Sequence, residues 1–223
     1  MSKPKTKKSA IPTTGFISFS SVITTSEVES NLHTSGTVAG SIPSPVYTGD
    51  DTELQSVFKK LLKKDAGTRK KALSDMQSII TDRGPAIVYG AMSHFVYVFN
   101  KLILDNDRLV REQLIKTLGQ LISVDMRALG SFRKNVIGWV WISDSDPSSN
   151  VAQAAINVIE MLAPTEKRET VIRNMLPSIL EQIQNVLSHA DYQGLSDLSS
   201  CSVEDAEERF ERYYCLSFIQ IYQ

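Results

Sequence analysis

An internal repeat limits the folds open to this sequence more than any other feature. Three stretches share one pattern of apolar residues at successive offsets of 42 and 41 residues. They are residues 68–79, 110–121 and 151–162. A period of about 40–47 residues is typical of HEAT and armadillo units, which are built from two or three helices. The repeat therefore predicts an all-α, HEAT/ARM-like α-solenoid, and an irregular helical bundle with accidental spacing is the alternative.

Apolar residues recur at helical spacing from Asp50 to the end of the chain. The expected helices cover residues 50–62, 65–83, 85–104, 107–124, 127–142, 148–162, 166–175, 177–189 and a last one from 203. Asp65, Asp107 and Asp146 precede the three repeated stretches. We expect each to cap the helix that follows and to pair with a neighbouring arginine.

Residues 1–49 have a different composition, rich in Ser, Thr, Gly and Pro. They carry too little apolar surface to offset the entropy of ordering, so we expect a flexible, disordered N-terminal arm. One motif interrupts it, at Gly15, Phe16, Ile17, Ser18 and Phe19. This motif is either an anchor for a partner or a stray apolar patch, and composition does not separate the two.

Residues 50–223 are expected to form the helical repeat domain. Its last helix ends with an apolar face at Phe218, Ile219, Ile221 and Tyr222. An exposed face of this kind suggests that the chain is truncated at its C-terminal end.

The stretch 85–100 contains no charged residue. It is shorter than the roughly 18–20 apolar residues that a membrane span needs, so a buried helix is the better interpretation.

No secretory signal is visible, because lysines near the start are followed by polar residues. The two cysteines have no metal-binding spacing. A reducing cytosol or nucleus is therefore the default location.

No catalytic signature is present: phosphate-binding loop, nucleophile elbow and metalloprotease motifs are all lacking. The three histidines lie far apart, and no Cys/His cluster suits zinc. An acidic run begins the last helix at Glu204, Asp205, Glu207, Glu208 and Glu211, and its simplest interpretation is a solvated face. We therefore expect no catalytic centre, cofactor or metal in this chain.

Positive charge is concentrated near the start of the helical region. The cluster consists of Lys59, Lys60, Lys63, Lys64, Arg69, Lys70 and Lys71, and Arg108 and Arg111 follow one repeat later. Such a cluster can neutralise phosphates independently of base sequence. An ordinary solvated surface is an equally good explanation from the residues alone.

These residues resemble the N-terminal domain of the listerin family, RING-type E3 ubiquitin ligases of ribosome-associated quality control. The resemblance rests on the arm motif at 15–19 and on the helix pair at 53–73, which reads ELxxVFKKLxKKDxxTRxKAL. Asp105, Asp107, Arg108, Val110 and Arg111 fit the next repeat of the family, as does Trp139. The likeness covers most of residues 15–165 and weakens beyond.

The resemblance implies that this chain is the first segment of a large cytosolic solenoid protein. It implies docking on the split large ribosomal subunit, near ribosomal RNA and the factor that recognises the stalled peptidyl-tRNA. The basic cluster is then the RNA-facing surface. E2 recruitment belongs to a zinc-binding RING that this chain lacks, so no cofactor and no membrane contact are expected here. The alternative function is a generic HEAT-repeat scaffold that grips a peptide in transport or adaptor work.

Overall fold

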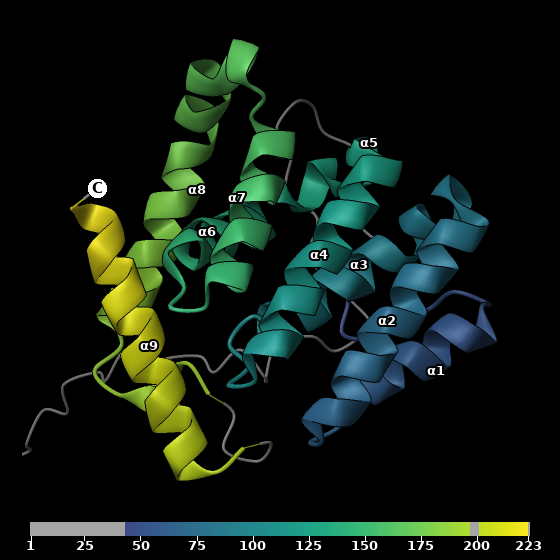
Figure 1. Ribbon diagram of the computed structural model, residues 1–223, viewed down its shortest axis with the longest axis horizontal. Coiled ribbons are helices and arrows are strands. Elements are labelled where there is room, and N and C mark those ends of the chain that lie inside the picture. The colour runs from purple at the N-terminus through teal and green to yellow at the C-terminus, as the bar shows by residue number, and fades with distance from the viewer. Residues whose placement is uncertain (1–42, 197–200, 223) are drawn as a thin grey trace, which may run out of the picture. The chain divides into compact units, whose positions relative to one another are not determined.

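The computed structural model describes residues 43–196 and 201–222, which belong to one unit of the chain, and in these residues it contains helices and no strand (Figure 1). The α-helices are α1 (Thr52–Leu61), α2 (Ala66–Arg83), α3 (Pro85–Leu102), α4 (Arg108–Val124), α5 (Met126–Leu129), α6 (Arg133–Ile142), α7 (Ser149–Leu162), α8 (Arg168–Ser188) and α9 (Val203–Ile221). Short 3₁₀ turns occupy Gly130–Phe132, Ser143–Ser145, Thr165–Lys167 and Tyr192–Gly194. The predicted all-α class is confirmed.

The helices pack in two rows, as in an α-solenoid. In one row α2 contacts α4 and α4 contacts α7, and in the other α1, α3, α6 and α8 contact one another in succession. The rows are joined by contacts within the pairs α1–α2, α3–α4 and α6–α7. Figure 1 shows this succession from the blue α1–α2 pair through the teal α4 to the green α7. The predicted solenoid-like fold is therefore confirmed, and its core lies between the rows.

Aspartates are the N-cap residues of α1, α2 and α4, as the sequence predicts. Asp51 accepts hydrogen bonds from the backbone of α1, Asp65 caps α2 and Asp107 caps α4. The prediction was wrong for Asp146, because Ser148 is the N-cap residue of α7. The repeat explains the error: Ser148 follows Asp107 by the same 41 residues that separate the second and third repeated stretches. Asp146 corresponds to Asp105, which is not a cap.

Two helix boundaries differ from the prediction. The expected helix at 127–142 is divided into α5, a 3₁₀ turn and α6, and the division begins at Gly130, where helix propensity is low. The expected pieces at 166–175 and 177–189 are one helix, α8, which continues through Pro177. Proline removes only one backbone donor there, and Met175 and Ile179 are buried on either side of it. Packing of α8 against α6 holds the helix together.

The charge-free stretch forms α3, a buried helix, as predicted. Its buried residues include Val88, Phe95 and Phe99, which face the core. The end of α2 before it is also as predicted, since Gly84 adopts a positive φ of 62° ahead of Pro85. None of the helices in the described residues has the length and hydropathy needed to span a membrane.

The last residues of the expected arm contact the helices. The backbone N–H of Ser44 donates to Ser93 Oγ at 3.0 Å, and Ser44 O accepts from His94 Nδ1 at 2.9 Å. The ring of Tyr47 lies 5.1 Å from that of Phe58. The segment 43–49 is thereby attached to α3 and α1. The motif at Gly15, Phe16, Ile17 and Phe19 lies outside the described residues, as does most of the arm.

Candidate docking surface

The turn between α3 and α4, residues 103–107, is bound by side chains from other helices. Arg212 of α9 donates through Nη2 to Leu104 O at 3.2 Å and to Asp105 O at 3.1 Å. The hydroxyl of Tyr213 donates to Ile103 O. Carbonyl groups at the end of a helix have no partner within the helix, so these donors satisfy groups that would otherwise need water. The turn is therefore a fixed point to which α9 is attached.

Arg111 links this turn to the next one. Its Nη1 donates to Asp105 O at 2.7 Å and Asn106 O at 3.1 Å. Its Nε and Nη2 each donate to one carboxylate oxygen of Asp146 at 3.0 Å. Two parallel bonds between a guanidinium and a carboxylate fix both groups in orientation as well as in distance.

Arg69 makes the same connection one repeat earlier. Its Nη1 donates to the carbonyl oxygens of Lys63 and Lys64 at 2.8 and 2.6 Å, and its Nη2 lies 2.8 Å from Asp105 Oδ2. The series stops in the third repeat, where Ala152 occupies the position of the arginine. The predicted pairing with an arginine is confirmed for Asp146 alone, whose partner is Arg111. It is wrong for Asp107, which pairs with Lys70, and for Asp65, because Arg69 reaches across to Asp105 of the next repeat instead. The matching offsets of the two arginines were the signal in the sequence.

The nine predicted phosphate-binding cations fall into two groups. Arg111 is buried and Arg69 is largely covered, with 3% and 11% of their side chains exposed, and both are held in the ion pairs above. Lys70 pairs with Asp107 at 3.1 Å and Lys60 lies 3.8 Å from Asp75.

The other five are exposed, and none has an ion pair among the described residues: Lys59, Lys63, Lys64, Lys71 and Arg108. We call these five residues the open basic surface. They lie on α1, on the α1–α2 turn, on α2 and at the start of α4. Their ammonium and guanidinium groups are the ones that an external anion can reach.

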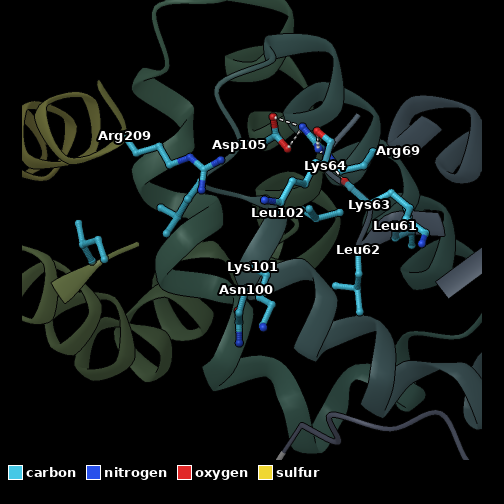
Figure 2. A pocket seen from close by; sticks show the side chains of 12 residues that line it. Leu61, Leu62, Lys63, Lys64, Arg69, Asn100, Lys101, Leu102, Asp105 and Arg209 are labelled. Atoms are coloured by element: carbon cyan, nitrogen blue, oxygen red, sulfur yellow. Dashed lines mark hydrogen bonds and ion pairs between the residues drawn. The ribbon is translucent and has the colours of Figure 1, made fainter. Parts of the chain in front are cut away.

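A pocket of about 370 Å³ opens beside this surface. Leucines form much of its wall, and Lys63, Lys64, Lys101 and Arg209 contribute positive charge. Figure 2 shows Arg209 on one side of the pocket and Lys63 and Lys64 on the other, with Leu102 between them. We call it the cationic pocket. The sequence did not indicate it, because α9 lies outside the repeat and about one hundred residues from α3 in the chain.

The acidic run of α9 is exposed, and two of its members also contact the α3–α4 turn. Asn106 Nδ2 donates to Asp205 Oδ1 at 3.0 Å and to Glu208 Oε2 at 3.2 Å. Hydrogen bonding by the Ser202 side chain lowers the pKa of Asp205. The acidic residues therefore help to hold α9 against the turn.

Metal-ligating side chains are not clustered in the described residues. No group of three or more His, Cys, Asp or Glu side chains in that part of the chain is arranged to hold a metal ion. The one buried histidine there, His94, lies among Tyr47, Phe58 and Tyr97. The open basic surface and the cationic pocket offer positive charge and a concave wall, and these features suit the binding of a partner.

Comparison with known proteins gives consistent matches. Residues 49–222 match the family described as "E3 ubiquitin-protein ligase listerin, N-terminal domain". The E3 ubiquitin-protein ligase listerin of Gallus gallus is 28% identical over 171 residues, which cover 77% of this chain and 10% of that protein. The listerin of Caenorhabditis elegans is 27% identical over 161 residues, 72% of this chain and 11% of that protein.

A fungal relative matches a similar share of the chain at lower identity. The listerin of Saccharomyces cerevisiae is 23% identical over 183 residues, which cover 76% of this chain and 11% of that protein. The chain thus spans about a tenth of the length of the curated relatives that it matches.

Proposed function

The chain belongs to the listerin N-terminal domain family, and from this membership we propose that it docks an E3 ubiquitin ligase on the large ribosomal subunit. The family match over 49–222 is the observation that carries the proposal. Ubiquitin transfer to stalled nascent chains is then the work of a zinc-binding RING outside this chain, which recruits the E2. In this proposal the chain positions the ligase on the ribosomal subunit and takes no part in ubiquitin transfer.

Charge is the physical basis of the proposed docking. Ribosomal RNA presents a dense array of phosphates, and cations that replace condensed counterions gain affinity that falls steeply with salt. The open basic surface offers five such cations whose charge is not neutralised by a carboxylate among the described residues. Arg69 and Arg111 hold the helix pairs in register and so support this surface from within.

The same proposal assigns the remaining partners. The stalled peptidyl-tRNA recognition factor is expected beside the docked chain, and the arm motif at 15–19 is an anchor for such a protein. The cytosol is the expected location, because the large ribosomal subunits that carry stalled chains are found there.

Co-sedimentation with purified large ribosomal subunits tests the proposal. The intact chain is expected to pellet with the subunits at low salt and to be released as salt rises. Reversing charge at four positions of the open basic surface, with Lys59→Glu, Lys63→Glu, Lys64→Glu and Lys71→Glu, is expected to abolish pelleting. Each lost phosphate contact is also expected to reduce the slope of log K against log salt by roughly 0.7–0.9.

A variant of equal net charge provides the control. Arg127, Lys134, Lys167 and Arg168 are exposed on or next to other helices, and replacing all four by Glu changes the charge by the same amount. This control is expected to retain subunit binding. If both quadruple variants lose binding equally, the effect is one of net charge and the proposed surface is wrong. If both retain it, docking does not use these lysines.

A further inference from the structure

The cationic pocket combines an apolar wall with positive charge, and no part of the proposed docking accounts for that combination. Leu61, Leu102, Leu104 and Leu195 line it, and Leu62 stands at its edge with 48% of its surface exposed. A phosphate backbone gains nothing from a leucine wall. A large apolar side chain does, since it buries surface against the wall.

The net charge of the pocket is positive. Lys63, Lys64 and Lys101 have no ion pair among the described residues, although Lys101 Nζ lies 5.0 Å from the ring centre of Tyr97. Arg209 donates through Nε to the neutral Asn106 side chain at 3.2 Å. The one carboxylate in the lining, Asp105, is already paired with Arg69. An occupant with carboxylates is therefore favoured.

Asn100 adds a polar group suited to a peptide. It lines the pocket, and its Oδ1 is buried without a hydrogen-bond partner in the described part of the chain. A buried acceptor of this kind is costly until a donor reaches it. A peptide group offers both a donor and an acceptor, and rotation of the Asn100 amide can meet either one. Phosphate oxygens offer no donor.

The lining also argues against bound nucleobases. Proteins that hold single-stranded nucleic acid stack the bases on aromatic side chains, and no aromatic residue lines this pocket among the described residues. We therefore propose that the cationic pocket binds a short acidic peptide segment of a partner protein. A large apolar side chain of that segment lies against the leucines, and its carboxylates meet Lys63, Lys64, Lys101 and Arg209.

This site is separate from the proposed ribosomal docking in most of its residues. Lys101, Leu62, Asn100 and Arg209 belong to the pocket alone. Lys59 and Lys71 belong to the open basic surface alone. Variants at these two sets of positions therefore test the two proposals independently.

Selection from a phage-displayed library of random peptides, with the whole chain as bait, tests the pocket. The enriched peptides are expected to carry acidic residues around a large aliphatic or aromatic residue. One of them, made synthetically with a fluorescent label, is then titrated with the chain and followed by anisotropy. Lys101→Glu and Leu62→Ser are each expected to weaken its binding by about tenfold or more.

Two controls accompany the titration. Lys134→Glu matches Lys101→Glu in charge and lies on α6, outside the pocket, so it is expected to leave the affinity unchanged. The double variant Lys59→Glu/Lys71→Glu is expected to bind the peptide normally while co-sedimenting poorly with ribosomal subunits. Lys101→Glu and Leu62→Ser are expected to bind the peptide weakly and still to co-sediment with ribosomal subunits. Circular dichroism confirms that each variant is folded.

Three outcomes overturn the proposal. The selection enriches no acidic, apolar peptide, or the enriched peptides bind Lys101→Glu and Leu62→Ser as tightly as the unaltered chain. The third outcome is that a labelled single-stranded RNA oligonucleotide binds the unaltered chain but not the variants Lys101→Glu and Leu62→Ser. The pocket would then be part of a nucleic-acid surface.

Discussion

Arg111 and Asp146 are 35 residues apart in the sequence, yet their side chains form a bidentate ion pair that is almost closed to solvent. The guanidinium also donates to two carbonyl oxygens of the α3–α4 turn. One side chain thus fixes the spacing between the second and third helix pairs. The loss of either partner leaves a buried charge without compensation.

Arg111→Ala is expected to lower the free energy of unfolding by about 3–5 kcal/mol, because it leaves the buried Asp146 carboxylate without its ion-pair partner. Urea denaturation followed by circular dichroism measures the change. Arg108→Ala is the control: Arg108 is exposed three positions earlier on the same helix, and its removal is expected to cost less than about 0.5 kcal/mol. Equal losses for both variants would contradict a structural role for the pair.

Gly138 allows α6 and α8 to approach closely. A Cβ atom at this position would overlap the Cβ of Gln182 and press on the backbone oxygen of Ser178. Gly138→Ala is therefore expected to destabilise the chain by about 1–3 kcal/mol. Gly130→Ala is expected instead to stabilise the chain by about 0.4–1 kcal/mol. A Cβ atom built at Gly130 meets no other atom within 4 Å, and the backbone there is helical. Thermal unfolding of the two variants tests the contrast.

His94 makes the stability of the chain sensitive to mild acid. Burial lowers the pKa of His94, and its Nδ1–H donates to Ser44 O. The unfolded chain therefore takes up a proton on this ring at a higher pH than the folded chain does. Its contribution to stability is complete above the ordinary pKa of about 6.5 and is lost as the pH falls below that value.

His94→Asn keeps a donor near Ser44 O but cannot titrate. The free energy of unfolding of this variant is expected to change less between pH 7 and pH 5 than that of the unaltered chain. Urea titrations at several pH values measure both slopes. The same slope in both chains would show that another group governs the pH dependence.

Tyr213 holds α9 to the α3–α4 turn through its hydroxyl. Tyr213→Phe removes the donor to Ile103 O and is expected to cost about 1–3 kcal/mol. Tyr214→Phe, at the exposed next residue, is expected to cost much less. Urea unfolding at neutral pH compares the free energies of unfolding of the two variants. Equal losses would show that the Tyr213 hydroxyl does not anchor α9.

Alkaline pH gives an independent test of the same residue. Burial raises the pKa of Tyr213 to about 12, so the folded chain keeps its proton where the unfolded chain releases it near pH 10. Its contribution to stability is therefore complete below about pH 10 and is lost as the pH rises towards 12. The chain with Tyr213→Phe is expected to lose less stability over that interval, as measured by the urea midpoint.

The sequence alone determined the fold class and most helix boundaries, because apolar spacing and capping are local properties of the chain. The period of 41–42 residues predicted the solenoid-like stack, and the uncharged segment at 85–100 was identified as a buried helix. Local rules failed where packing outweighed propensity. The helix α8 crosses Pro177 because its apolar face is buried against α6 on both sides of the proline.

Only the tertiary structure decided which charges are available. Nine cations look alike in the sequence, but Arg69 and Arg111 are enclosed between consecutive turns, and five others are left open to solvent. The cationic pocket required α9 to lie beside the α3–α4 turn, a contact between residues about one hundred positions apart. A side chain's neighbours across the fold determine its exposure and its charge partners, and no local pattern in the sequence records them.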